Sequence, residues 1–309
     1  MKRRIIAALA AAALTATLGA GISPAAADEP DGVAYVALGD SVASGNGLLP
    51  YVDPDCLRSK KSYPALLAKA SGLSFASEAC TEATTSDVAG QLQALVLAGA
   101  IGSDTELVTL TVGVNDVMWG QNLEFGWGEA LIACSNAGVF PAGTCQTALY
   151  LSLLSLDPPD PALPSLSERI AALIGAIHAV APNARIVVTG CPVLFGDVAG
   201  TCSVGLLDIP GVVRTQLTYG ELERVWINQA VMAANAMIAQ GVALAGVPNS
   251  FYVDVNLVPG GFDGHGLCDT GGRWISGLFP STAQPRDRGF HPNAAGQQAY
   301  AAIIAPLIP

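Results

Sequence analysis

Charged residues are scarce in this sequence, and cations are the scarcer kind. Only 13% of the 309 residues are charged, and 14 lysines and arginines face 25 aspartates and glutamates, for a formal net charge of −11. This acidic balance, without a basic aromatic patch, argues against nucleic acid as a partner. Hydrophobic residues make up 51% of the chain, which allows a large core and argues against disorder.

Motifs that bind cofactors and metals are also missing. The sequence contains no Walker A phosphate loop and no dinucleotide fingerprint, and its cysteine spacings do not match a zinc site. We therefore expect neither a cofactor nor a metal. No segment beyond the N-terminus has the length and apolarity of a membrane span.

The N-terminal 27 residues have the pattern of a secretory signal peptide. Three cations at positions 2–4 precede an apolar run, residues 5–18, and a row of small residues ends at Ala27, near which we expect cleavage. A retained membrane anchor is the alternative, but the run is short. The expected product is a secreted chain of residues 28–309, whose formal charge falls from −11 to −14 when the three cations are removed.

Strand-like and helix-like segments alternate along this mature chain. Such alternation predicts an α/β fold with a parallel sheet and helices on both faces. Residues 117–164 are the least regular part, and we interpret them as an insertion beside the functional site of a single domain. Strands are predicted near 33–38, 73–79, 107–112, 185–190 and 251–255, and helices near 63–70, 87–100, 165–180, 222–245 and 293–308.

The first candidate functional motif is residues 39–45, with the sequence GDSVASG. This stretch follows the first predicted strand, and its glycines allow a sharp turn there. Open α/β sheets place ligand crevices at the carboxyl ends of their strands. Ser41 is therefore a candidate nucleophile, although Gly-Asp-Ser taken alone is only a turn.

Two further motifs, later in the chain, support a functional role for Ser41. Residues 113–116, with the sequence GVND, follow a strong predicted strand, and His291-Pro292 precedes the C-terminal helix. A serine, a Gly-x-Asn-Asp and a His-Pro in this order resemble the GDSL family of SGNH hydrolases. The resemblance covers nearly all of the mature chain and is closest to secreted actinobacterial esterases and lipases. It implies a three-layer αβα fold similar to flavodoxin, with a five-stranded parallel sheet.

The resemblance also implies a role for each motif. Ser41 would attack an ester carbonyl and form an acyl-serine intermediate, with His291 as its base. Asn115 and the backbone N–H of Ser41 would hold the oxyanion. The third donor is the backbone N–H of a position that is glycine in the family and Glu82 here. Glutamate lacks glycine's freedom at positive φ, and its carboxylate would oppose the oxyanion unless it faces solvent.

A second departure concerns the residue that orients His291. Many family members have an aspartate three residues before the histidine, where this chain has Arg288. The imidazole still needs an acceptor that fixes its tautomer. We favour the backbone carbonyl of Arg288, and the side chain of Asp287 is the alternative.

Several other residues are open to two interpretations. His178 lies in a predicted helix and is read as structural, whereas His265, in a glycine-rich loop, competes with His291 as the base. Trp119 and Trp127 either line an acyl pocket or pack in the core. Two acidic residues next to the motifs are expected to fix loop geometry, namely Asp40 and Asp116.

All seven cysteines lie in the exported part of the chain, where disulfides are the default. Their odd number leaves at least one unpaired or bonded elsewhere, and the sequence does not fix the connectivity. The family resemblance implies three pairs, Cys56–Cys80, Cys134–Cys145 and Cys202–Cys268. Cys191 is then left as a buried thiol, with a reactive nucleophile as the alternative.

The sequence therefore supports a secreted serine hydrolase that cleaves carboxylic esters, as an esterase or lipase acting on a small-molecule or lipid ester. The same site could instead serve an acetylated polysaccharide or a phospholipid. A non-catalytic secreted binding protein on the same fold is the alternative of a different class. We expect a monomer.

Overall fold

The computed structural model describes residues 31–278 and 288–309. The predicted signal peptide and Asp287 lie outside the described residues. Within them, none of the helices has the length and apolar character needed to cross a membrane.

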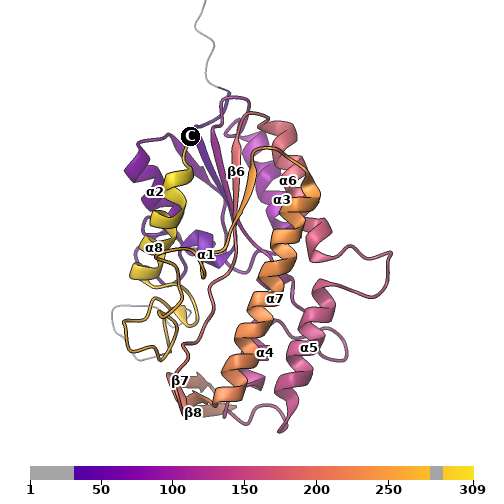
Figure 1. The fold of residues 1–309 in the computed structure, drawn as a ribbon, viewed down its shortest axis with the longest axis vertical. Coiled ribbons are helices and arrows are strands. Elements are labelled where there is room, and N and C mark those ends of the chain that lie inside the picture. The colour runs from indigo at the N-terminus through magenta and orange to yellow at the C-terminus, as the bar shows by residue number, and fades with distance from the viewer. Residues whose placement is uncertain (1–30, 279–287) are drawn as a thin grey trace, which may run out of the picture.

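A five-stranded parallel sheet forms the centre of the molecule, as predicted (Figure 1). Two of its three inner strands, β1 and β5, are buried along their whole length, because helices cover both faces. In spatial order the strands are β4 (Phe75–Ser77), β1 (Tyr35–Gly39), β5 (Leu107–Thr111), β6 (Arg185–Thr189) and β9 (Ser250–Val253).

Helices form the other two layers. Figure 1 shows α2 and α8 on one side of the sheet and α3, α6 and α7 on the other, which confirms the αβα arrangement. Capping boxes at Thr84 and Ser165 start α3 and α6, the second where the sequence predicted it. The bounds are α2 (Tyr63–Ser71), α3 (Thr85–Leu97), α6 (Leu166–Val180), α7 (Glu221–Ala245) and α8 (Ala294–Ile304).

Most of the smaller elements lie around the carboxyl ends of the strands, whereas the last 3-10 turn contacts Arg185 at the amino end of β6. The segment 117–164, predicted to be irregular, contains two helices, α4 (Trp127–Ala133) and α5 (Thr144–Leu156). An antiparallel hairpin, β7 (Cys202–Ile209) and β8 (Val213–Tyr219), was not predicted, although Pro210-Gly211 between its strands is a turn signal. The remaining elements are α1 (Ser41–Ser44), β2 (Tyr51–Asp53), β3 (Arg58–Ser59) and the 3-10 turns η1 (Val114–Asp116) and η3 (Ala305–Leu307).

All three implied disulfides are present, and they join segments near one end of the sheet. Cys56–Cys80 links the loop between β2 and β3 to the segment after β4, and Cys134–Cys145 joins α4 to α5. Cys202–Cys268 ties the hairpin to the C-terminal loops. Cys191 is a buried free thiol, as expected.

Candidate functional site

A cavity of about 470 Å³ lies at the carboxyl ends of the strands. Ser41, Glu82, Asn115 and His291 all line it, from segments that follow β1, β4 and β5 and that precede α8. The fold thus brings together four residues that are far apart in the sequence. The rest of the wall is largely apolar and includes Val114, Val117, Met118, Trp127, Leu131, Leu194, Val231 and Phe290.

Ser41 is placed by a sharp turn after β1. Gly39 has φ of +143°, and a Cβ on it would lie 2.4 Å from the carbonyl oxygen of Thr111 on the neighbouring strand. Asp40 then caps α1, because its carboxylate accepts the backbone N–H of Val42 at 2.9 Å. Ser41 therefore stands at the first position of a short helix, and it is only 7% exposed.

The carboxyl group of Asp40 is fully buried beside this serine. Burial raises its pKa to about 7, against the lowering effect of hydrogen bonds from the α1 backbone. Its Oδ2 atom has no hydrogen-bond partner among the described residues. The cap agrees with the expected role of Asp40 in fixing the loop, but the charge of this carboxylate is unfavourable in the folded state.

Gln297 connects the serine segment to the C-terminal helix that follows His291. Its side chain has no exposed surface, donates from Nε2 to the carbonyl oxygen of Val42 at 2.9 Å, and accepts the backbone N–H of Tyr63 at 2.6 Å. Asn293 caps the start of the same helix α8. The position of His291 relative to Ser41 therefore depends on this buried amide.

The ring of His291 is held by a backbone carbonyl, but not by the predicted one. Nδ1 lies 2.9 Å from the carbonyl oxygen of Gly289, whereas the carbonyl of Arg288 accepts the backbone N–H of His291 at 3.1 Å. Phe290 has φ of +63°, so the chain reverses between Gly289 and the ring. The prediction of Arg288 as the ring acceptor is corrected to Gly289.

Two candidate oxyanion donors flank the serine. Asn115 donates one amide hydrogen to the carbonyl oxygen of Ala83 at 3.1 Å, which fixes the orientation of its side chain. Glu82 adopts φ of +61°, the conformation that a glycine would supply, and the residue is exposed. The backbone at this position therefore keeps a glycine-like geometry, at a cost of about 1–2 kcal/mol for a residue with a Cβ.

Asp116 joins the loops that carry these two donors. Its carboxylate accepts the backbone N–H of Thr85 at 3.0 Å and the Thr85 hydroxyl at 2.5 Å, and Arg169 lies 3.8 Å away. Burial raises the pKa of Asp116 despite these partners. This network agrees with the expected role of Asp116 in fixing loop geometry.

Of the remaining candidate residues, some line the cavity and others do not. Trp127 lines the cavity, whereas Trp119 packs against Phe125 with ring centroids 4.9 Å apart. His265 stacks on Trp274 and does not line the cavity, and neither does His178 on α6. Cys191 does line it, but burial raises the pKa of its thiol, which does not favour a thiolate nucleophile.

Gly289 and Gln297 were not predicted from the sequence. A left-handed conformation at a phenylalanine cannot be read from the sequence, and it is this conformation that turns the Gly289 carbonyl toward the ring. Gln297 lies six residues after His291 in an alanine-rich helix. The only available signal was a polar residue at a position that the helix buries.

Comparison with known proteins gives one consistent result. Residues 37–299 match the model of the GDSL-like lipase/acylhydrolase family. The chain is 34% identical to Lipase 2 of Streptomyces coelicolor over 97% of this chain and 95% of that protein, and 32% identical to Lipase 1 of the same organism over 93% and 90%.

Two crystal structures from the same genus resemble the fold at 30% identity. Phospholipase A1 from Streptomyces albidoflavus NA297 superposes with a TM-score of 0.67, and an extracellular lipase from Streptomyces rimosus with a TM-score of 0.66. Each comparison covers 88% of this chain and 98% of the other.

The burial of Asp40 predicts a pH-dependent stability. The unfolded carboxyl ionises near pH 4, while the folded one does so near pH 7. Its contribution to the unfolding free energy is therefore present below pH 4 and is lost as the pH rises to 7. The variant Asp40→Asn keeps an oxygen for the cap and removes the charge.

We therefore expect the unfolding free energy of Asp40→Asn to exceed that of the wild type by about 2–4 kcal/mol at pH 8. Urea unfolding at pH 4.5, 6 and 8 measures this difference. The prediction fails if the unfolding free energies of the two proteins change equally with pH.

The conformation of Glu82 predicts a difference between two substitutions. Glu82→Gly removes the left-handed penalty but increases the entropy of the unfolded chain, so we expect a net gain of about 0.5–1 kcal/mol. Glu82→Ala keeps a Cβ at the same φ and should stay within about 0.5 kcal/mol of the wild type. Urea unfolding of the wild type and both variants at one pH gives the unfolding free energies to compare. The prediction fails if Glu82→Ala stabilises the protein as much as Glu82→Gly does.

Proposed function

We propose a catalytic mechanism for a chain that belongs to the GDSL-like lipase/acylhydrolase family and is, like its relatives, a carboxylic ester hydrolase. In this mechanism Ser41 is the nucleophile and His291 is the general base. The observation that supports it is the single cavity lined by Ser41, Glu82, Asn115 and His291.

The reaction proceeds through an acyl-enzyme. His291 takes the proton from the Ser41 hydroxyl as its oxygen attacks the ester carbonyl, and then gives that proton to the leaving alcohol. Water, activated by the same imidazole, releases the acid. The backbone N–H groups of Ser41 and Glu82 and the amide of Asn115 stabilise the oxyanion, and such donors contribute about 3–4 kcal/mol each when preorganised.

In the proposed mechanism a carbonyl, rather than a carboxylate, orients the base. With Nδ1–H donated to the Gly289 carbonyl, 2.9 Å away, the other ring nitrogen Nε2 is the one that accepts the serine proton. This arrangement is a Ser-His dyad. Asp287 stays the alternative orienting residue.

The apolar wall of the cavity supports an ester with a hydrophobic acyl chain, and Trp127 and Leu131 belong to the acyl-binding surface in this proposal. Phospholipid is a second candidate substrate, favoured by the resemblance to the phospholipase A1 from Streptomyces albidoflavus NA297. An acetylated polysaccharide has no comparable support from the apolar wall.

We further propose that the enzyme is secreted as a single-domain monomer after loss of residues 1–27. Three disulfides support an oxidising location, and the similar lipase from Streptomyces rimosus is described as extracellular.

Removal of the nucleophile tests the mechanism directly. We expect the mature protein to hydrolyse p-nitrophenyl esters and Ser41→Ala to lose at least about 10³-fold in kcat, because the backbone donors alone cannot form the acyl-enzyme. The preferred class of substrate is found by comparing esters of short and long acyl chains with a phospholipid. Circular dichroism controls for folding.

One result would contradict the proposed hydrolase mechanism. A folded wild-type protein that hydrolyses none of these esters, and whose Ser41 is not labelled by an organophosphonate ester, would be a binding protein that keeps the fold.

The dyad predicts that Asp287 is dispensable. We expect Asp287→Asn to keep kcat within about threefold of the wild type, because the Gly289 carbonyl fixes the imidazole. For comparison, loss of the tautomer-fixing carboxylate in a true triad costs about 10⁴-fold in kcat. Steady-state kinetics with one p-nitrophenyl ester distinguish the two, and a loss of several orders of magnitude would assign the role to Asp287.

A further inference from the structure

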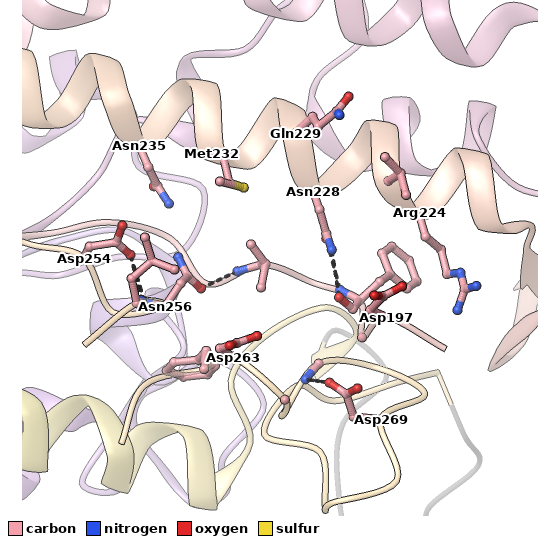
Figure 2. Close-up of a pocket in the computed structure, with 18 of the residues that line it drawn as sticks. Asp197, Arg224, Asn228, Gln229, Met232, Asn235, Asp254, Asn256, Asp263 and Asp269 are labelled. Carbon is pink, nitrogen blue, oxygen red and sulfur yellow. Dashed lines mark hydrogen bonds between the residues drawn. The ribbon is translucent and has the colours of Figure 1, made fainter. Parts of the chain in front are cut away.

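A second cavity, larger than the candidate active site, lies along α7. Its volume is about 970 Å³, and it is bounded by α7, by the segment 193–199 and by the segment 252–269 (Figure 2). None of the four candidate catalytic residues lines it. Its volume falls within the range of small-molecule sites, about 300–1,000 Å³.

Apolar side chains of α7, which we call the α7 row, form part of one face of this cavity. The row consists of Leu222, Val225, Met232, Ala236 and Ala239, at successive spacings of three, seven, four and three residues that place them along one side of the helix. Gln229 interrupts it between Val225 and Met232. Leu222 and Met232 are 62% and 52% exposed. Phe195, Leu257 and Phe262 add to the apolar lining from the two loop segments.

Carboxylates surround the same cavity. Five of its lining residues are acidic, namely Asp197, Glu221, Asp254, Asp263 and Asp269. Figure 2 shows Asp197 and Asp263 on the loop side, across from α7. The one cation among the described lining residues is Arg224, which is 3% exposed and donates to the carbonyl oxygens of Gly220, Val198 and Gly200. The backbone thus holds Nε and Nη2 of its guanidinium, whereas the buried Nη1 has no hydrogen-bond partner among the described residues. The five acidic side chains outnumber this one cation and give the cavity a negative potential.

Tyr252 also lines the cavity, and its hydroxyl has no partner among the described residues. The hydroxyl oxygen of Tyr252, at the end of β9, has almost no contact with solvent and no hydrogen-bond partner among the described residues. A phenol oxygen can accept a hydrogen bond from an ammonium group, as the carboxylates can.

A thin wall separates this cavity from the candidate active site. In residues 191–195 Val193 and Phe195 line the α7 cavity, whereas Pro192 and Leu194 line the catalytic one. Three buried or half-buried asparagines hold the wall through its backbone, with bonds of 2.7–3.2 Å to Asn228, Asn235 and Asn256. A ligand in the α7 cavity therefore occupies a site of its own.

We propose that the α7 cavity is a second binding site that takes a single-chain amphiphile with a cationic head. The chain lies on the α7 row, where it removes exposed apolar surface from water. The ammonium head lies among the carboxylates of the opposite loops. Charge complementarity selects this ligand over an anionic amphiphile such as a fatty acid.

Isothermal titration calorimetry with dodecylammonium, below its critical micelle concentration, tests the site without any ester substrate. We expect saturable binding by the wild type, and at least tenfold weaker binding of dodecyl sulfate and of dodecyl maltoside. Failure of the proposed catalytic mechanism would leave this binding unchanged, so the two proposals fail separately.

Matched variants locate the bound probe. Ala236 is exposed, so Ala236→Trp fills the cavity with little risk to folding, and we expect it to abolish binding. Met118→Trp adds similar bulk to the candidate active site and should leave the affinity within about twofold. Loss of binding in Met118→Trp but not in Ala236→Trp would place the probe in the catalytic cavity and overturn the proposal.

Charge variants test the selectivity. Asp197→Asn with Asp263→Asn should weaken dodecylammonium binding about fivefold, the effect of two exposed ion pairs. Asp55→Asn with Asp157→Asn makes the same change in net charge away from the cavity and should have no effect. No binding by the wild type, equal binding of the sulfate, or equal loss in both double variants would overturn the proposal.

Discussion

The amide of Gln297 is the interaction on which the candidate active site depends most. It is fully buried and joins the carbonyl of Val42, next to Ser41, to the backbone N–H of Tyr63 at the start of α2. Without it, two backbone groups would lose their partners in a dry interior, where each unsatisfied group costs about 1–3 kcal/mol. Because the same helix begins three residues after His291, one side chain fixes the serine, α2 and the histidine in a common frame.

The main chain provides much of the chemistry at this site. The carbonyl of Gly289 contacts the imidazole, and in the proposed mechanism the N–H groups of Ser41 and Glu82 contact the oxyanion. Backbone groups survive most substitutions, so a glutamate at the position where the family resemblance implies glycine still offers an N–H. What such a substitution must preserve is the backbone conformation, and Glu82 does so at φ of +61° with its residue exposed.

Much of the fold was predictable because its strands are short apolar segments followed by motif residues. Ser41 and Asn115 follow β1 and β5, and the parallel sheet places both at one edge. The acceptor for His291 was assigned one residue too early, since a left-handed Phe290 leaves no trace in composition. Helices α4 and α5 were missed for a different reason. Their segment lacks a regular polar face, and it packs within the hydrophobic core through Leu149 and Leu156.

The Cys56–Cys80 disulfide has a consequence for where the catalytic centre can be completed. Cys80 lies two residues before Glu82, and the carbonyl of Cys56 accepts the N–H of Thr81 at 3.1 Å, so the bridge holds the backbone that presents the proposed third oxyanion donor. In a reducing compartment the two thiols stay unlinked and this segment keeps only its weaker contacts. Oxidation then adds a covalent constraint directly beside the candidate active site, at the segment that carries Glu82.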